Sequence, residues 1–246
     1  MLTSEELERY QRQILIIGKN GQELLKQKKV LQVGLGGLGS PLSLYLISSG
    51  IGELIVFEND SLSLSNLGRQ ILYNTDDVNK SKGDLAKSVL SKLNPNTKIT
   101  LINERFTEQN AEKYLKNAQI DYLVDASDNF ETKFLINDMG LKYNIPFTIA
   151  GIQGFDGQLI SVNPHETACY RCIFGDIPKT DKSQPIPVIS PTCGVVGSLE
   201  ANEVIKGLLK RGKRITDNLL MISLDLGDFT LIPIKKNPKC ECQLKY

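Results

Sequence analysis

The most constraining feature of this sequence is a glycine-rich turn between a predicted strand and a predicted helix. The apolar run 29–33 leads directly into Gly34-Leu35-Gly36-Gly37-Leu38-Gly39, and apolar residues at helical spacing follow Pro41. Glycines at such a turn let the backbone approach phosphate oxygens, and the following helix N-terminus offers free N–H groups. We therefore expect Gly34, Gly36, Gly37 and Gly39 to bind a nucleotide. A tight turn that merely requires small residues is the alternative.

Strands and helices alternate through the first 150 residues. A capping-box pattern at Thr3 and Glu6 and apolar residues at helical spacing predict a helix over the first 15 residues. Strands are predicted at 29–33, 53–58, 99–103, 122–125 and 146–150, and further helices from residue 41 and at 82–93, 108–116 and 130–143. Such alternation is typical of a parallel sheet with helices on both faces.

The pattern changes after Gly151. The run 158–162 reads as a strand with only a short turn before it, so we expect it to be antiparallel. A proline-rich stretch at 176–191 has no clear pattern, and a helix at 195–210 and strands at 219–224 and 230–234 follow. We expect one α/β domain over residues 1–246, Rossmann-like and doubly wound. Its sheet is mostly parallel with an antiparallel C-terminal extension, and the halves divide near residue 150.

Composition limits the function classes. Lys and Arg together number 29 and Asp and Glu 28, a formal net charge of +1, which gives no reason to expect nucleic acid or an anionic membrane as partner. No apolar run approaches the roughly 20 residues that span a bilayer. The first six residues are acidic and polar, unlike a signal peptide, so we expect a cytoplasmic protein.

Polar residues suited to a triphosphate follow the second predicted strand. Glu58 ends that strand, where an acidic side chain accepts ribose hydroxyls. The serine- and asparagine-rich loop 59–70 presents Asn66 and Arg69, and Lys82 opens the next helix. Two cations and an amide beside a phosphate-binding turn suit a chain of phosphates. The glycine turn alone would also fit an NAD-dependent oxidoreductase, which has no use for Arg69 and Lys82.

The fourth predicted strand ends in Asp125-Ala126-Ser127-Asp128-Asn129, at the edge where open α/β sheets bind ligands. A carboxylate at Asp128 can hold Mg²⁺ against phosphates, because this ion takes oxygen ligands. Asp is also a favoured N-cap, so Asp128 can instead cap the helix predicted from residue 130. The spacing leaves both interpretations open.

The five cysteines argue against a disulfide framework, because the number is odd and no secretion signal is present. Four form two tight pairs, Cys169 with Cys172 and Cys240 with Cys242. Four thiolates suit a tetrahedral structural Zn²⁺ that would tie the C-terminal tail to the body; reduced surface thiols are the alternative. The single histidine, His165, is expected at the surface.

Together these motifs resemble the MoeB/ThiF/HesA family, bacterial relatives of the ubiquitin-activating enzymes. The resemblance rests on G-L-G-G-L-G, S-L-S-N-L-G-R-Q, Lys82, S-D-N and the two cysteine pairs, and it runs from Arg9 to Cys242. It implies an adenylyltransferase that uses MgATP to activate the C-terminal Gly-Gly carboxylate of a small ubiquitin-like sulfur-carrier protein. Such carriers, MoaD- or ThiS-like, serve molybdopterin or thiamine biosynthesis. The alternative functions are an NAD-dependent oxidoreductase and a non-catalytic scaffold that binds ubiquitin-like proteins.

The resemblance also implies residue roles. Arg12 would reach into the site of a partner subunit, which implies a homodimer, and Gly37 and Glu58 would contact ATP through its phosphates and ribose. Asn66 and Arg69 would touch the triphosphate, Lys82 would neutralise β/γ charge, and Asp128 would bind Mg²⁺. The remaining expected ATP-binding residues are Asp60, Ser65, Leu67, Gly68 and Asn129. Two departures stand out: the ribose acid is usually Asp, and the second cysteine pair is C-E-C where the family has C-x-x-C.

The fifth cysteine bears on where sulfur enters. In ubiquitin-activating enzymes, and in part of the thiazole branch, an acceptor thiol lies in the loop after the first cysteine pair. Here the loop 175–185 contains no cysteine, and Cys193 comes later. We expect Cys193 to pack in the core, with a nucleophilic role as the alternative. The enzyme would then stop at the acyl-adenylate and leave sulfur delivery to a separate donor protein, which leans towards the MoeB-like branch.

Overall fold

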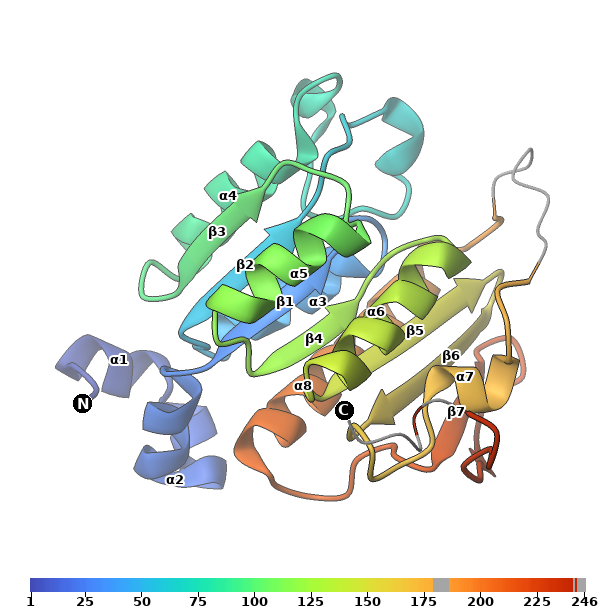
Figure 1. The fold of residues 1–246 in the computed structure, drawn as a ribbon. Coiled ribbons are helices and arrows are strands. Elements are labelled where there is room, and N and C mark those ends of the chain that lie inside the picture. Colours follow the sequence, from blue (N-terminus) through green and yellow to red (C-terminus); the bar gives the residue numbers. More distant parts are fainter. Residues whose placement is uncertain (179–185, 241, 243–246) are drawn as a thin grey trace.

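The computed structural model describes residues 1–178, 186–240 and 242 of the chain. Its centre is an eight-stranded sheet in the order β3-β2-β1-β4-β5-β6-β7-β8 (Figure 1). β1 to β5 are parallel, and β6, β7 and β8 add antiparallel strands at one edge. The expected mostly parallel sheet with an antiparallel C-terminal extension is confirmed. The strands are β1 (Lys29–Val33), β2 (Glu53–Phe57), β3 (Lys98–Ile102), β4 (Tyr122–Asp125), β5 (Phe147–Gln153), β6 (Asp156–Val162), β7 (Asn218–Ser223) and β8 (Asp228–Pro233).

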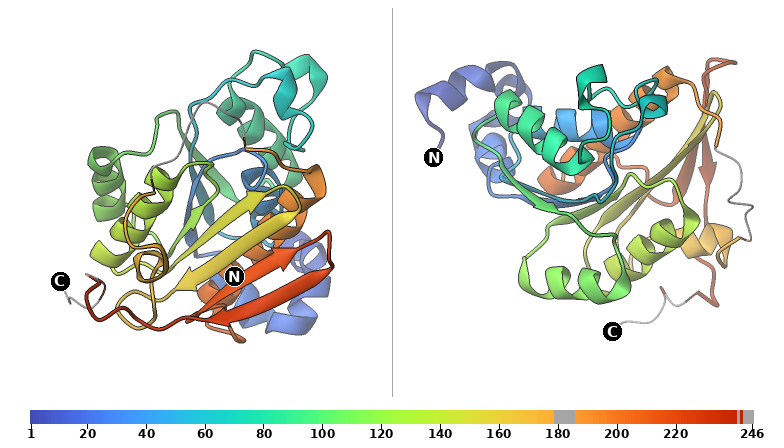
Figure 2. Two further views of the ribbon diagram at one scale, coloured as in Figure 1. Left: turned by 90° about the vertical axis from the view of Figure 1, so that its right-hand side faces the viewer. Right: turned by 90° about the horizontal axis from the view of Figure 1, so that it is seen from above.

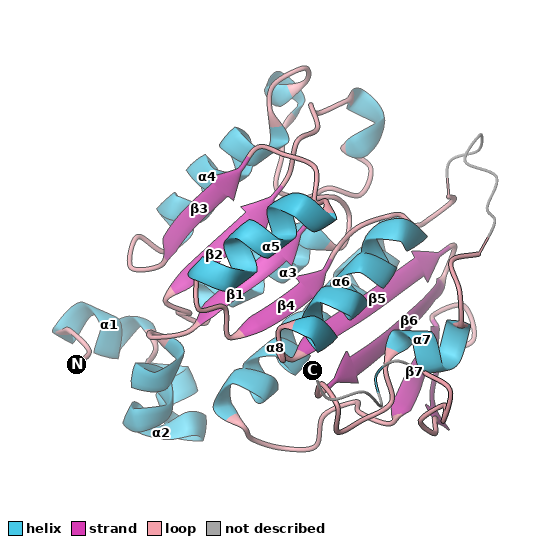
Figure 3. Cartoon of the chain, in the orientation of Figure 1, coloured by secondary structure: helices cyan, strands magenta, loops and turns pink. Residues whose placement is uncertain are grey.

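Helices cover both faces of the sheet, as Figures 2 and 3 show. The helices are α1 (Ser4–Arg9), α2 (Gln11–Leu25), α3 (Gly39–Ser48), α4 (Lys82–Leu93), α5 (Glu108–Asn117), α6 (Phe130–Lys142), α7 (Tyr170–Phe174) and α8 (Ser190–Leu209). One apolar core joins the sheet to α3, α4 and α8, for example through Leu46, Leu90 and Val204. The other joins it to α5 and α6, through Leu115 and Phe134. The two cores make the fold doubly wound.

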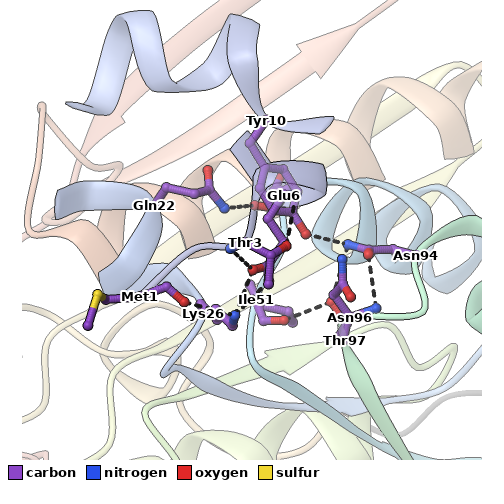
Figure 4. A network of polar contacts seen from close by, with 11 residues as sticks. Met1, Thr3, Glu6, Tyr10, Gln22, Lys26, Ile51, Asn94, Asn96 and Thr97 are labelled. Carbon is purple, nitrogen blue, oxygen red and sulfur yellow. Dashed lines mark hydrogen bonds and ion pairs between the residues drawn. The ribbon is translucent and has the colours of Figure 1, made fainter. Parts of the chain in front are cut away.

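The N-terminal segment differs from its prediction, because one helix ends at Arg9 and α2 begins at Gln11, with a further break inside α2 at Gly18, where φ is +75°. The capping box is present, since the Thr3 hydroxyl accepts the Glu6 N–H at 3.2 Å and the Glu6 carboxylate accepts the Thr3 N–H at 2.8 Å. The break lies at Tyr10, whose hydroxyl accepts a hydrogen bond from the Asn94 amide at 2.8 Å (Figure 4). A Cβ at Gly50 would stand 2.5 Å from the Tyr10 ring, so tyrosine packs there only because residue 50 is glycine.

The same network fixes the first two helices to the body. Glu6 is buried and pairs with Lys26 at 2.8 Å, and the Gln22 amide donates to the Ser49 carbonyl at 3.0 Å (Figure 4). Figure 1 shows α1 and α2 beyond the amino ends of the parallel strands. This end of the molecule is opposite to the edge where ligands bind in open α/β sheets.

Two further differences concern the second half of the chain. α8 begins at Ser190, earlier than the expected residue 195, because Pro191 is accommodated in its first turn. The short helix α7 after Cys169 lacked a periodic signal in the sequence. Within the unpatterned stretch 176–191, residues 179–185 lie outside the described residues. No helix in the described part of the chain is long and apolar enough to cross a membrane.

Candidate active site

A cavity of about 1160 Å³ opens at the carboxyl ends of the parallel strands. One side is lined by the glycine turn and by residues that follow β2 and β4. The other side is lined by β5 and β6, including Gly151, Gly157 and Gln158. The expected site residues that line the cavity are Gly34, Gly36, Gly37, Glu58, Asp60, Asn66, Arg69, Lys82, Asp128 and Asn129. Topology thus brings together residues from five separate segments of the sequence.

Some expected residues lie outside the cavity lining. Gly39 lies beneath the turn, and Arg12 is exposed on α2. Ser65, Leu67 and Gly68 belong to the loop behind Asn66 and Arg69, and Leu67 packs against the core. A Cβ at Gly68 would meet open space, so no steric reason for glycine exists at that position.

The glycines of the turn serve different purposes. Gly34 has a φ of +97°, and a Cβ there would lie 2.6 Å from the Ala126 carbonyl oxygen. A Cβ at Gly39 would lie 2.4 Å from the Gly34 oxygen. Both positions therefore require glycine for packing alone. Gly36 and Gly37 line the cavity, and there the absence of side chains exposes the backbone to a ligand. Gly37 is also required for packing, because a Cβ there would lie 2.7 Å from the Cys193 sulfur.

Gln32 supports this turn from below. Its buried side-chain amide donates to the carbonyl oxygens of Gly34 at 2.9 Å and Gly39 at 3.2 Å. Sequence reasoning missed this residue. The available signal was a glutamine within an otherwise apolar strand.

Glu58 is buried at the end of β2, and its carboxylate connects two backbone segments. One oxygen accepts the Leu35 N–H at 2.9 Å, and the other accepts the N–H groups of Asn59 and Asp60 at 2.9 and 2.8 Å. A carboxylate has about four acceptor positions, so capacity for a ribose hydroxyl remains. The extra methylene relative to Asp lets this side chain reach back to the glycine turn.

The loop after β2 holds its polar side chains by internal contacts. The Asn66 amide oxygen accepts the Ser63 N–H at 3.1 Å, and Arg69 donates to the Ser65 carbonyl at 3.2 Å. Lys82, at the start of α4, is only 5% exposed, and its ammonium lies 3.2 Å from an Asp60 carboxylate oxygen. The cavity wall thus presents the cations of Arg69 and Lys82 on one side of the glycine turn.

The geometry excludes one of the two interpretations of Asp128. The N-cap of α6 is Asn129, whose side-chain oxygen accepts the Thr132 N–H at 2.9 Å. Asp128 is exposed, and its one side-chain contact among the described residues is the Asn129 amide at 3.5 Å. The helix-cap interpretation of Asp128 is therefore wrong. Its carboxylate is available in the cavity, as an oxygen ligand for a divalent cation must be.

A buried ion pair lies directly beneath this turn, and sequence reasoning missed it. The Lys133 ammonium lies 2.6 Å from Asp125, and it also donates to the carbonyl oxygens of Ser127 at 2.9 Å and Ala150 at 2.6 Å. Burial raises the pKa of Asp125, while Lys133 acts in the opposite direction. The signal in the sequence was a lysine on the first turn of a helix whose preceding strand ends in aspartate.

The four paired cysteines converge, although they come from two distant segments. The sulfur of Cys169 lies 3.8 Å from that of Cys172 and 3.5 Å from that of Cys240, and Cys172 lies 3.4 Å from Cys242. All four sulfur atoms lie within 4.8 Å of one another. Burial and the neighbouring thiols raise the pKa of Cys242 to about 12. Thiolates this close repel unless a cation joins them, so the cluster can hold a metal such as Zn²⁺.

Cys193 and His165 complete the expected residues. Cys193 is 1% exposed in the first turn of α8, and burial raises its pKa, with Arg69 opposing that shift. The thiol is therefore packed in the core, as expected. His165, expected at the surface, is half-buried, and its Nε2 lies 3.0 Å from the Leu141 carbonyl oxygen.

The chain is also similar in sequence to known proteins. The model of the ThiF family matches residues 10–243. The chain is 39% identical to the sulfur carrier protein adenylyltransferase of Thermus thermophilus, over 97% of this chain and 91% of that protein. It is 37% identical to the Escherichia coli sulfur carrier protein ThiS adenylyltransferase, over 83% and 82% of the two chains. It is 35% identical to the E. coli molybdopterin-synthase adenylyltransferase, over 98% and 97%.

A solved structure of E. coli MccB with ATP is also similar. The TM-score is 0.83 at 26% sequence identity, and the alignment covers 98% of this chain and 75% of that chain.

Proposed function

The chain belongs to the ThiF family and is an adenylyltransferase, and on that premise we propose that it activates the C-terminal Gly-Gly carboxylate of a small ubiquitin-like sulfur-carrier protein. The observation that carries this proposal is the two-sided cavity. A turn suited to phosphates, with Arg69 and Lys82, faces a second side formed by β5 and β6. A nucleotide and a polypeptide tail can therefore meet in one space.

The β5–β6 side suits a tail without side chains. Gly151 and Gly157 line the cavity, and the turn between the two strands lies at its mouth. Gly157 is also required for packing, because a Cβ there would lie 2.5 Å from Val196 of α8. A chain end of two glycines can approach such a surface closely, whereas a bulky residue would be held away from the glycine turn. This side would therefore select a Gly-Gly terminus.

The reaction requires little proton transfer by the protein. A carboxylate oxygen of the carrier attacks the α-phosphorus of ATP while the bond from that phosphorus to the β-phosphate oxygen breaks, which gives an acyl-adenylate and pyrophosphate. The nucleophile is already ionised at neutral pH, so no general base is needed. Positioning and stabilisation of the developing charge remain, and these are what Arg69, Lys82 and the backbone at Gly37 supply.

Mg²⁺ would be held by Asp128 and would neutralise phosphate charge when bound. The exposed carboxylate of Asp128 fits such an ion, because α6 is capped by another residue. Glu58 would hold the ribose, and Asn66 and Arg69 would contact the phosphates.

Arg12 would act in a homodimer. It lies on α2, beyond the amino ends of the strands, whereas the cavity lies at their carboxyl ends. An arginine there serves a cavity only if the cavity belongs to a second subunit. Zn²⁺ would be held by Cys169, Cys172, Cys240 and Cys242 and would fasten the C-terminal segment. A separate protein would donate the sulfur, because Cys193 is packed against the glycine turn.

Pyrophosphate–ATP exchange tests the proposal. The purified protein should incorporate labelled pyrophosphate into ATP only when a carrier ending in Gly-Gly is present. The same carrier with its last glycine deleted is the matched control and should support no exchange. Comparison of a MoaD-like with a ThiS-like carrier assigns the pathway to molybdopterin or thiamine. Absence of exchange with every Gly-Gly carrier, in protein that binds ATP, would overturn the proposal.

A further inference from the structure

We propose that Lys133 is a positioning residue, which fixes the turn that presents Asp128 and joins the two sides of the cavity. The proposal rests on the proposed function and extends it to a residue that does not contact a ligand. Lys133 lies on the first turn of α6 and lines the cavity floor with 6% of its surface exposed.

The ammonium of Lys133 has no N–H donor left to bind a phosphate. An ammonium has three N–H donors, and the three go to Asp125, to the Ser127 carbonyl and to the Ala150 carbonyl. Asp125 neutralises the charge at 2.6 Å. Lys133 therefore differs from Arg69 and Lys82, although all three cations line the same cavity.

These acceptors belong to three backbone segments that must be held together. Asp125 ends β4, Ser127 belongs to the turn before Asp128, and Ala150 lies in β5 next to Gly151. The second Asp125 oxygen accepts the Ser127 hydroxyl at 2.6 Å and the Ser127 N–H at 3.2 Å. The turn is thus bound from both sides, by the ammonium on its carbonyl and by the carboxylate on its N–H and hydroxyl.

The position of this pair connects the nucleotide side with the β5–β6 side. Asp128 lies one residue after Ser127, and Gly151 lies one residue after Ala150. One side chain therefore fixes both the turn that would hold Mg²⁺ and the start of the surface that would receive the carrier tail. Groups that orient the ligands of a metal site typically change metal affinity by about 10- to 100-fold when removed.

The test uses ATP binding measured by calorimetry, with Mg²⁺ and with excess EDTA, on the full chain. In Lys133→Met, the gain in ATP affinity that Mg²⁺ gives should fall by about tenfold or more, while metal-free affinity stays unchanged. Hydrogen exchange of the amides at 126–129 should become faster. Lys133→Arg keeps the cation and its donors and should restore most of the gain.

Lys133→Met leaves Asp125 buried and unpaired, so it can fail to fold. Ser127→Ala removes the 2.6 Å bond to Asp125 and a long 3.5 Å contact with the Asn129 carbonyl, both within the turn, and tests the same turn more mildly. Thr148→Val is the control, because it deletes a buried hydroxyl of β5 that bonds Tyr122 and Ser161, not the turn. It should lose stability without changing the effect of Mg²⁺.

The outcomes separate the two proposals. If Ser127→Ala and Lys133→Met behave like Thr148→Val, the positioning role of Lys133 is wrong, and pyrophosphate exchange by the wild type still supports the proposed function. A fall in metal-free ATP affinity in Lys133→Met would also overturn the role, since it would make Lys133 a phosphate ligand. If the wild type neither gains ATP affinity from Mg²⁺ nor catalyses exchange, the proposed function itself fails.

Discussion

Asn129 caps helix α6 by accepting the Thr132 N–H at 2.9 Å, which leaves the neighbouring carboxylate of Asp128 to face the cavity. Asn129 thus has the structural task, and Asp128 remains free for the contact with Mg²⁺ that we propose. Sequence spacing could not assign these tasks, because Asp and Asn are both good N-caps.

Substitution at the two positions should separate stability from chemistry. We expect Asp128→Ala to abolish pyrophosphate–ATP exchange with almost no change in the free energy of unfolding. Asn129→Ala should lose about 1 kcal/mol of stability, as for other N-caps. Urea unfolding measures the stability of both variants, and the exchange assay measures their activity. Near-normal pyrophosphate–ATP exchange in Asp128→Ala would show that Asp128 has no role in the active site.

Arg12 gives a test of action between subunits. Arg12→Ala and Arg69→Ala should each be close to inactive. In a mixture of the two, a mixed dimer has one cavity with its own Arg69 and the partner's intact Arg12. With free subunit exchange, about one quarter of wild-type activity should return, because half the dimers are mixed and each has one complete site. Mixtures no more active than either variant alone would indicate that Arg12 acts within its own chain or has no role.

Glu200 should make stability depend on pH. It is fully buried on α8, and neither carboxyl oxygen has a hydrogen-bond partner among the described residues. Burial raises its pKa well above the ordinary value, the charge of Asp125 raises it further, and Lys133 opposes this. At a pH between the pKa of Glu200 in the unfolded state and its higher pKa in the folded state, the folded protein therefore keeps the proton and the unfolded protein releases it.

The sign follows from this difference. Between the unfolded pKa and the folded pKa the native protein binds one more proton, so stability falls by about 1.4 kcal/mol per pH unit as pH rises. Glu200→Gln removes the titrating group and should be more stable than wild type at pH 7 and above, with the gap closing near pH 4. Urea unfolding across pH 4 to 8 measures it, and a gap that does not vary with pH would contradict the protonated state of Glu200.

The cysteine cluster predicts a bound metal. Protein purified without chelator should contain about one Zn²⁺ per chain, as a four-thiolate site holds one ion. Cys242→Ser should lower the metal content and speed proteolysis near residues 235–240, because the tail loses its anchor. Cys193→Ser leaves the cluster intact and is the matched control. Folded wild-type protein that contains no metal would remove the assignment.

An element of this structure can be predicted from the sequence when the residues that determine it lie close together in the chain. β1, β4 and α4 have the expected bounds, because apolar runs, glycines and the Ser81 cap mark them within a few residues. The helix break at Tyr10 depends on Asn94 and Gly50, which are distant in sequence.

The same distinction applies to the candidate site. Motifs identify three glycines of the turn, Arg69, Lys82 and Asp128, and these residues line one cavity. Lys133 was not found, because its partner Ala150 reaches it only through the pairing of β4 with β5. A sequence motif identifies side chains that face a ligand. The groups that hold those side chains in place can be identified only when the strand pairing is known.

Cys193 supplies the last prediction, which concerns the source of sulfur. Its sulfur lies against the glycine turn, since a Cβ at Gly37 would stand 2.7 Å from it. A protonated, 1% exposed thiol is a poor nucleophile. Cys193→Ala should therefore keep both pyrophosphate exchange and formation of the carrier thiocarboxylate when a sulfur donor protein is supplied. Mass spectrometry of the carrier C-terminus measures the thiocarboxylate. Normal exchange with no thiocarboxylate would make Cys193 the acceptor thiol and would place the enzyme with the ThiF-like branch.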